Sequence, residues 1–203
     1  MNMMISYQEL VRTFPKYGEH FECDSKKQII YSHDIDGDDT FIILSGVVSL
    51  RRGENVLVGI AQAPFIMGLS DGVMKTDVQY RLMTESNCTG YHLPASQTIN
   101  IIEQYQLWRE AFCWLAWQNA MLELRDLQLI GNNSYDQIRA TLISMTKWDE
   151  VLRSRIGVMN YIHQRTRISR SVVAEVLAAL RKGGYIEMNK GKLVSINRLP
   201  FEY

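Results

Sequence analysis

Basic side chains gather in the last seventy residues of the chain. Residues 134–203 contain 12 Lys and Arg against 6 Asp and Glu, a net charge of +6, whereas residues 1–133 contain 10 against 16, a net charge of −6. Clustered cations bind a nucleic-acid backbone because each neutralised phosphate releases condensed counterions. The asymmetry therefore indicates a nucleic-acid-binding portion joined to an acidic portion of another kind.

The segment around Ser169 carries the side chains best suited to read base pairs. Ser169 is a favourable N-cap, and the apolar positions of the helix after it leave Arg170, Ser171 and Glu175 on the other side. Arg170 can bond a guanine edge twice and Ser171 can bond several bases, whereas Glu175 can accept from cytosine or pair with an arginine. A solvated helix face is the alternative interpretation. The predicted DNA-contacting residues are Arg165, Thr166, Arg167, Ser169, Arg170, Ser171, Glu175, Lys182, Lys190 and Lys192.

Two helices, a tight turn and a hairpin must position these residues. Helical periodicity runs from Tyr135 to Ile162, and the helix capped by Ser169 stops at Gly183-Gly184. Residues 185–188 and 193–197 flank Asn189-Lys190-Gly191-Lys192, a sequence typical of a tight turn. This order predicts a winged helix-turn-helix with its second helix in a major groove and its wing on the backbone or minor groove. The expected phosphate contacts are Thr166, Arg167 and Lys182.

Short β-prone runs occupy residues 28–93. The clearest strands are QIIY, TFIILSGVVSL, NVLVGIA, YRLMTE and TGYHL. Turn sequences such as Asp36-Gly37-Asp38-Asp39 and Arg52-Gly53-Glu54-Asn55 separate them. Many short strands joined by such turns predict an antiparallel sandwich or barrel-like roll.

A long apolar helix follows, with Ser96 as its expected cap, a break near Tyr105 and an end at Ile130. One stripe has the seven-residue spacing of a helix packed along a partner helix, with Ala111 at an intermediate position. A neighbouring stripe is also apolar and must be buried, and we expect it to pack against the β-roll of the same chain. It consists of Trp114, Trp117, Met121 and Leu124. A helix buried wholly within a monomer is the alternative. The predicted dimer-interface residues are Trp108, Phe112, Leu115, Asn119, Leu122 and Leu129.

Other chemistries lack the residues they need. Asp34, Asp36 and Asp38 alternate as in a calcium loop, but the glycine and final glutamate of that loop are missing. The four histidines are scattered and no nucleophile-elbow motif occurs, so we expect neither a metal site nor an enzyme. Cys23, Cys88 and Cys113 lack paired spacing and are expected as buried free thiols rather than a redox sensor. Without a signal peptide or a membrane span, the chain is expected in the cytoplasm.

Three stretches resemble the Crp/Fnr superfamily of bacterial transcription regulators. TFIILSGVVSL is similar to the family's I-L-S-G-x-V strand, PFIMGL to the opening of its nucleotide-binding cassette, and ISRSVVAEVLAALRKGGYI to its recognition helix. Within the superfamily, the chain resembles a divergent enterobacterial branch. The resemblance implies an α+β fold with an N-terminal cyclic-nucleotide-binding-like antiparallel β-roll, a long dimerisation helix and a C-terminal winged helix-turn-helix. The expected boundaries are 1–95, 96–131 and 132–203.

The resemblance implies a homodimer that binds double-stranded DNA, with RNA polymerase as a candidate further partner. Departures from the family pattern argue against a cofactor. Leu69 follows Gly68 where cyclic-AMP-binding members have Glu, and Val78 and Gln79 stand near the place of their Arg-Ser or Arg-Thr pair. Arg81 is a poor substitute for that arginine, and the cysteine cluster of the oxygen-sensing branch is absent. A protein-interaction module with an acidic roll and a switch with an apolar effector remain alternatives.

Overall fold

The fold is taken from a computed structural model that describes residues 3–26, 28–29, 39–53, 55–74, 78 and 80–201. The chain forms two compact units, Met1–Leu122 and Glu123–Tyr203, and each is described by itself. The domain boundaries expected from the sequence remain predictions. The calcium-like alternation of Asp34, Asp36 and Asp38 lies outside the described residues.

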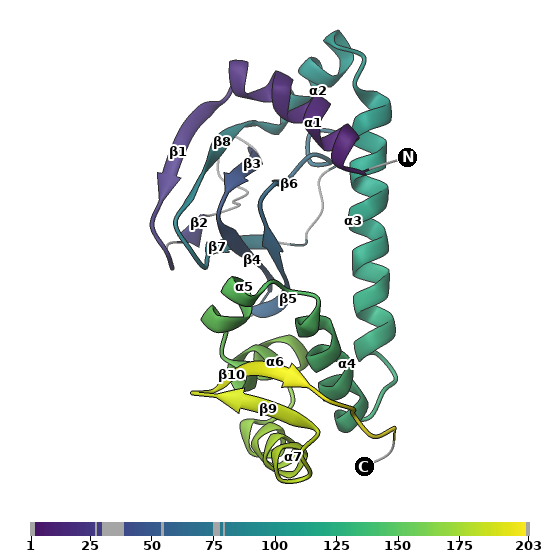
Figure 1. Ribbon diagram of the computed structural model, residues 1–203. Helices are drawn as coiled ribbons and strands as arrows, with labels where there is room; N and C mark the ends of the chain where they lie inside the picture. The colour runs from purple at the N-terminus through teal and green to yellow at the C-terminus, as the bar shows by residue number, and fades with distance from the viewer. Residues whose placement is uncertain are drawn as a thin grey trace. The chain divides into compact units, whose positions relative to one another are not determined.

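The first unit contains two antiparallel sheets (Figure 1). Their strand orders are β1-β8-β3-β6 and β2-β7-β4-β5. This arrangement confirms the antiparallel β-roll predicted from the short strands and turns. The strands are β1 (Glu19–Cys23), β2 (Gln28–Ile29), β3 (Asp39–Ser45), β4 (Val47–Arg52), β5 (Val56–Gln62), β6 (Phe65–Met67), β7 (Tyr80–Thr84) and β8 (Cys88–Pro94).

Gly46 divides the run TFIILSGVVSL, which the sequence pattern had assigned to a single strand. Gly46 has φ +95°, and a Cβ atom there would lie 2.3 Å from the Asn87 carbonyl oxygen. Only glycine, which lacks a Cβ and readily adopts a positive φ, fits this position. The chain consequently leaves β3 in one sheet and enters β4 in the other.

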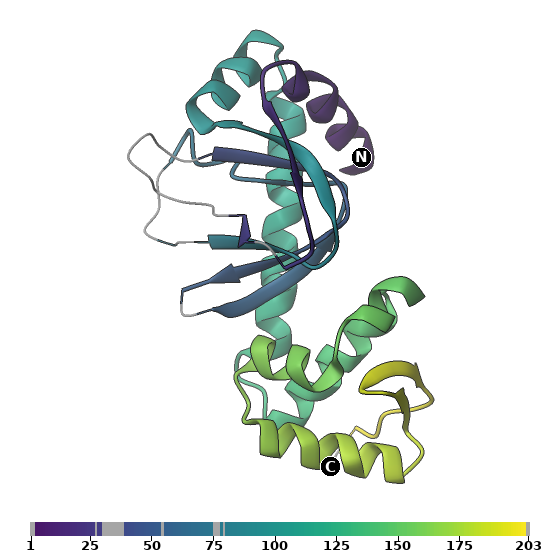
Figure 2. The ribbon, with the colours of Figure 1, turned by 90° about the vertical axis from the view of Figure 1, so that its left-hand side faces the viewer.

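Helices flank the sheets of the first unit (Figures 1 and 2). The elements are α1 (Met3–Thr13), the short 3₁₀ helix η1 (Phe14–Lys16), α2 (Ala95–Gln104) and α3 (Trp108–Leu129). The expected break near Tyr105 is confirmed, because Tyr105 caps the end of α2. The expected cap at Ser96 is wrong: α2 begins at Ala95 after Pro94, so Ser96 lies inside its first turn.

Trp114 anchors α3 in the core of the first unit. Its side chain is fully buried, and its Nε1 donates a hydrogen bond to the Ile66 carbonyl oxygen at 3.1 Å. Gln118 Nε2 donates to the same oxygen at 3.0 Å. Ring centroids of Tyr7 and Phe65 lie 5.5 and 5.8 Å from Trp114. The expected packing of α3 on its own β-roll is therefore confirmed for Trp114 and Trp117. It is wrong for Met121 and Leu124, which are exposed. Ala111, expected on the stripe facing a partner, is buried in this core instead.

The described residues of the second unit form the C-terminal end of α3, four further helices and a two-stranded hairpin. Figure 2 shows their arrangement within the unit. The stretch from Tyr135 to Ile162 is divided among three helices rather than being continuous. Asn133 and Asp149 cap the first two of these by accepting from backbone N–H groups at 2.9 and 2.7 Å. The elements are α4 (Ser134–Thr146), α5 (Glu150–Arg155), α6 (Val158–Thr166), α7 (Arg170–Lys182), β9 (Ile186–Asn189) and β10 (Lys192–Ile196).

Among the described residues, no helix has the length and apolar character required to span a bilayer. Among the same residues, no group of three or more His, Cys, Asp or Glu side chains is placed to hold a metal ion.

Candidate nucleic-acid interface

Helix α7 has one buried face and one exposed face. Val173 and Leu180 are fully buried, and Val176 and Leu177 are nearly so. These positions follow the spacing of one helix face, which packs into the second unit. The polar face left in solvent includes Arg170, Ser171, Ala174, Glu175, Ala178 and Lys182. An exposed helix that starts with an arginine and a serine has the form needed to enter a DNA groove.

The N-terminus of α7 is held by its predicted cap. Ser169 Oγ accepts a hydrogen bond from the Val172 backbone N–H at 3.4 Å. The same hydroxyl lies 3.0 Å from Ser171 Oγ. Arg170 Nη2 donates to Asn160 Oδ1 at 3.4 Å. Asn160 was not predicted from the sequence, since its contact with Arg170 joins two helices across the turn and leaves no local spacing pattern.

The turn between α6 and α7 is fixed by its own polar groups. Arg167 adopts a left-handed conformation with φ 64° and is exposed. The Ile168 carbonyl oxygen lies 2.8 Å from His163 Nδ1, so this nitrogen carries the proton. Thr166 Oγ1 donates to the Ile162 carbonyl oxygen at 2.8 Å and accepts from the Ile168 N–H at 3.2 Å. The Thr166 hydroxyl, expected on a phosphate, therefore already has partners within the turn.

Arg165 is buried, whereas the sequence predicted it at the DNA-contacting surface. Only 8% of its surface is exposed, and its Nη2 donates to Gln128 Oε1 at 3.0 Å. Burial raises the pKa of the neighbouring Tyr161 hydroxyl, and the positive charge of Arg165 opposes that rise. The side chain thus links α6 to the end of α3 inside the second unit. Arg165 is a structural cation in the interior, and the expectation that it contacts a phosphate is corrected.

The wing has the predicted two-residue turn. Lys190 and Gly191 both have positive φ, 47° and 77°, as a type I′ hairpin turn requires. The Gly191 carbonyl oxygen accepts from the Val158 N–H at 3.0 Å, which attaches the turn to the start of α6. Lys192 Nζ donates to the Arg155 carbonyl oxygen at the end of α5. Lys190 is exposed at the tip, whereas Lys192 is engaged in holding the wing to the helices.

The connection from α7 to the wing is a Schellman motif. The Tyr185 N–H donates to the Leu180 carbonyl oxygen at 2.9 Å, and the Gly184 N–H to that of Arg181 at 3.0 Å. Gly184 has φ +69°, the left-handed conformation of this motif. A Cβ at Gly183 would lie 2.4 Å from the Tyr185 ring. The two glycines therefore end α7 for different reasons, one conformational and one steric.

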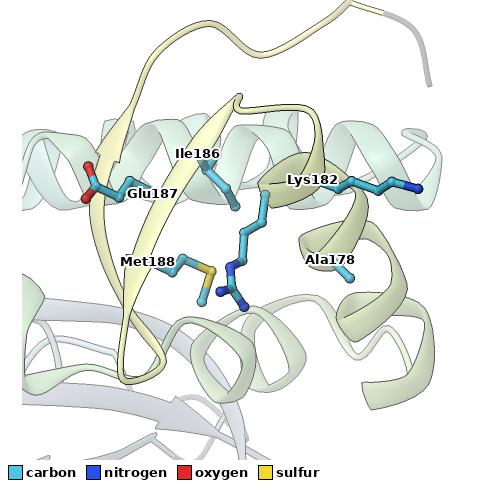
Figure 3. A pocket seen from close by; sticks show the side chains of 6 residues that line it. Ala178, Lys182, Ile186, Glu187 and Met188 are labelled. Carbon is cyan, nitrogen blue, oxygen red and sulfur yellow. The ribbon is translucent and has the colours of Figure 1, made fainter.

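An open hollow separates the end of α7 from strand β9 (Figure 3). Lys182 and Glu187 extend to opposite sides of it. Glu187 Oε2 accepts from Ser195 Oγ at 3.3 Å, so this carboxylate faces the hairpin partner strand. The helix side of the hollow carries the two basic residues. Its lining residues are Ala178, Arg181, Lys182, Ile186, Glu187 and Met188.

The predicted dimer stripe on α3 differs in exposure from one residue to the next. Phe112 is 72% exposed and Trp108 46% exposed, and Asn119 is also exposed. Leu115 packs partly against the core of the first unit. Leu122 and Leu129 are half-buried. Large apolar side chains left in solvent on a helix mark a surface that can bind another protein.

The structure describes Leu69 and Arg81, two of the cassette residues considered in the sequence. Leu69, which follows Gly68, is 2% exposed and belongs to the core. Arg81 is exposed, while its neighbour Leu82 is fully buried, so the arginine points away from the core. Gln79 lies outside the described residues.

Comparisons with known proteins agree with this architecture. A family described as "Winged helix-turn-helix DNA binding" matches residues 134–201. The protein named "Inhibitor of hydrogen peroxide resistance" from Escherichia coli (strain K12) is 72% identical over 197 residues, which cover 97% of this chain and 95% of that protein. The chain belongs to this family. The Salmonella typhimurium protein of the same name is 68% identical over the same shares of both chains. This group is the enterobacterial branch that the sequence resembled.

Solved structures with low sequence identity establish the fold. A regulator from Xanthomonas campestris, described as responsive to c-di-GMP, matches with a TM-score of 0.77 at 14% identity over 94% of this chain and 99% of its own. A protein described as a Crp/Fnr-family transcriptional regulator from Eubacterium rectale matches with a TM-score of 0.70 at 12% identity, over 97% and 91%. The chain therefore has the Crp/Fnr fold, with a β-roll and a winged helix-turn-helix.

Proposed function

We propose that this protein is a dimeric transcription regulator of the Crp/Fnr type that binds double-stranded DNA without a cyclic nucleotide. The observation that carries the proposal is the exposed face of α7, with Arg170, Ser171 and Glu175 in solvent opposite a buried apolar face. In this proposal α7 enters the major groove, and the residues after its N-cap read base edges. The role requires no catalytic chemistry, and it takes place in the cytoplasm.

The proposed contacts divide into two groups. Arg170, Ser171 and Glu175 contact bases, whereas Arg167, Lys182 and Lys190 contact phosphates. Ser169 caps the helix at the groove. Arg181, on the helix side of the hollow, is added to the phosphate group because it stands beside Lys182. Thr166 and Lys192 contribute by holding the turn and the wing, since their polar atoms are engaged there.

The dimer forms in this proposal through the exposed side of α3. Trp108, Phe112 and Asn119 supply its exposed centre, and Leu115, Leu122 and Leu129 flank it. Burial of Phe112 alone against a partner would remove a large apolar side chain from water. Two recognition helices related by a two-fold axis read half-sites about 34–36 Å apart, one helical turn of DNA. RNA polymerase is the proposed protein partner at a promoter.

Selection of bound sequences from a random DNA pool tests this function with the purified protein. The expected result is an enriched motif with two-fold symmetry and half-sites separated by about one DNA turn. An interaction module whose acidic roll binds a protein predicts no enrichment above the starting pool. Enrichment that persists when Arg170, Ser171 and Glu175 are all replaced by Ala would overturn the assignment of α7 as the reading helix.

A further inference from the structure

Cys23 and Cys88 lie directly opposite each other on neighbouring strands. Cys23 is the last residue of β1, Cys88 is the first of β8, and the antiparallel register pairs them. The next pair on the same face is Phe21 with Gly90, where the Phe21 ring lies over the glycine. Opposed residues of an antiparallel pair point to the same side of the sheet. The two thiols therefore share the inner face.

Hydrogen bonds hold the chain on both sides of this cysteine pair. The β1–β8 ladder runs to one side of it. On the other side, Ser25 donates from its backbone N–H to Asn87 Oδ1 at 3.3 Å and from its hydroxyl to the Glu85 carbonyl oxygen at 3.1 Å. Thr84 Oγ1 donates to the Asp24 carbonyl oxygen at 2.6 Å. The register is thus fixed from both directions, and the thiols cannot drift apart without breaking these bonds.

The two thiols differ in their surroundings. Cys88 is 1% exposed, and its Sγ lies 3.4 and 3.3 Å from the carbonyl oxygens of Val47 and Ser86, either of which can accept its single S–H proton. Burial raises the pKa of the Cys88 thiol. Cys23 is half-buried at the end of an edge strand. A small oxidant in solution can consequently reach Cys23 and is kept from Cys88.

We propose that Cys23 and Cys88 are a modification site that closes to a reversible cross-strand disulfide on reaction with a small hydroperoxide. The Cys23 thiolate attacks the peroxide, forming an S–O bond and breaking the O–O bond, and hydrogen peroxide thereby releases one water. The Cys88 sulfur then attacks the Cys23 sulfur, an S–S bond forms and the S–O bond breaks, and the departing hydroxide takes up the Cys88 proton to leave as a second water. Two thiols lose two electrons, which the peroxide accepts. This role replaces the buried inert thiols expected from the sequence.

The fold can accommodate this bond. Directly opposed residues in an antiparallel pair have Cα atoms about 4.5 or 5.5 Å apart, and disulfides span about 4.4–6.8 Å. Oxidation removes the S–H donor of Cys88, but the Val47 carbonyl oxygen still accepts from the Glu85 N–H at 2.8 Å. The Val47 carbonyl oxygen therefore keeps a hydrogen-bond partner in the oxidised protein.

Thiol counting and peptide mapping of the full chain test the proposal. The reduced protein, with its three free cysteines, is exposed to hydrogen peroxide, quenched with an alkylating reagent and digested. The expected result is loss of two thiols and a Cys23–Cys88 cross-linked peptide, both reversed by dithiothreitol. Non-reducing electrophoresis should show that the bond lies within one chain.

Three variants sharpen the test. Cys113→Ser is the matched control and should still form the cross-link. Cys23→Ser should keep Cys88 and Cys113 as thiols. Cys88→Ala should still be oxidised at Cys23, to a sulfenic acid that dithiothreitol reduces, and should give no cross-link within the chain. Circular dichroism checks that both variants fold. In the unmodified chain, a disulfide that includes Cys113, a bond between two chains through Cys23, or stable oxidation of Cys23 without a cross-link would each overturn the proposal. So would three intact thiols in peroxide when Cys23 is readily alkylated.

Discussion

Arg170→Ala should lower both the affinity for DNA and the discrimination between base pairs. Arg170 is exposed at the first position of α7, and its bond to Asn160 is long and at the surface. The substitution should therefore change the free energy of unfolding by no more than about 0.5 kcal/mol. Removal of a bidentate guanine contact costs about 1–3 kcal/mol. A symmetric dimer makes this contact in both half-sites, so the total is about 2–6 kcal/mol, which corresponds to roughly 30-fold to 10⁴-fold in Kd.

Lys190→Ala should behave differently, because a phosphate contact carries no sequence information. Lys190 is exposed at the wing turn, so its removal should weaken binding to selected and scrambled DNA alike. The slope of log K against log salt should become less steep by about 0.9 for each phosphate that the variant no longer neutralises. Lys192→Ala should instead lower the free energy of unfolding, since Lys192 holds the wing to α5.

Fluorescence anisotropy with labelled duplexes, measured over a range of salt concentrations, separates these effects. The selected site, its single-base variants and a scrambled duplex are compared for each protein. Arg12→Ala is the matched control: it removes the same charge from a side chain that is 76% exposed on α1 in the first unit, and it should leave affinity unchanged. If Arg170→Ala binds as tightly and as selectively as the unmodified protein, placement of α7 in the groove must be abandoned.

The remaining predictions concern the dimer, the ligand and the stability of each unit. Phe112→Glu should give monomers in sedimentation while circular dichroism stays unchanged, since Phe112 is exposed; a dimer that persists would contradict the proposed interface. Calorimetry should detect no binding of cyclic AMP or cyclic GMP at physiological concentrations; a low-micromolar Kd would contradict the inference from Leu69. In urea unfolding, Gly184→Ala should lower the free energy of unfolding by about 1–2 kcal/mol. The cost is conformational, because φ is +69° and no neighbouring atom is close to the added Cβ. Trp114→Phe and Gln118→Leu combined in one chain should lower the free energy of unfolding by over about 1 kcal/mol more than the sum of the two single changes. Only the double variant removes both of these donors to the Ile66 carbonyl oxygen.

Local signals explain why the winged helix-turn-helix could be predicted from the sequence. Ser169 before an apolar stripe, the glycine pair after Lys182 and the Lys190-Gly191 turn each dictate backbone geometry within a few residues. Each of these features is present in the structure. Identification of the roll rested in the same way on short strands and turn sequences.

Contacts between distant segments explain the errors. Arg165 resembles its exposed neighbour Arg167 in the sequence, and only the approach of Gln128, 37 residues away, shows that it is an interior residue. Lys192 likewise resembles Lys190 until the end of α5 is placed beside it. The Cys23–Cys88 pairing was invisible for the same reason, because 65 residues separate the two positions and their register depends on the whole sheet.

The apolar pattern of helix α3 predicted only part of its packing. Its sequence is apolar over two adjacent faces, so spacing alone cannot say which face covers the core of the same chain. Trp114 decides the matter, because its N–H reaches the Ile66 carbonyl oxygen and its ring is fully buried. That anchor draws Ala111 into the core and leaves Phe112, the next residue, in solvent. A test of the dimer should therefore change Phe112 rather than Leu115, whose loss would also disturb the β-roll.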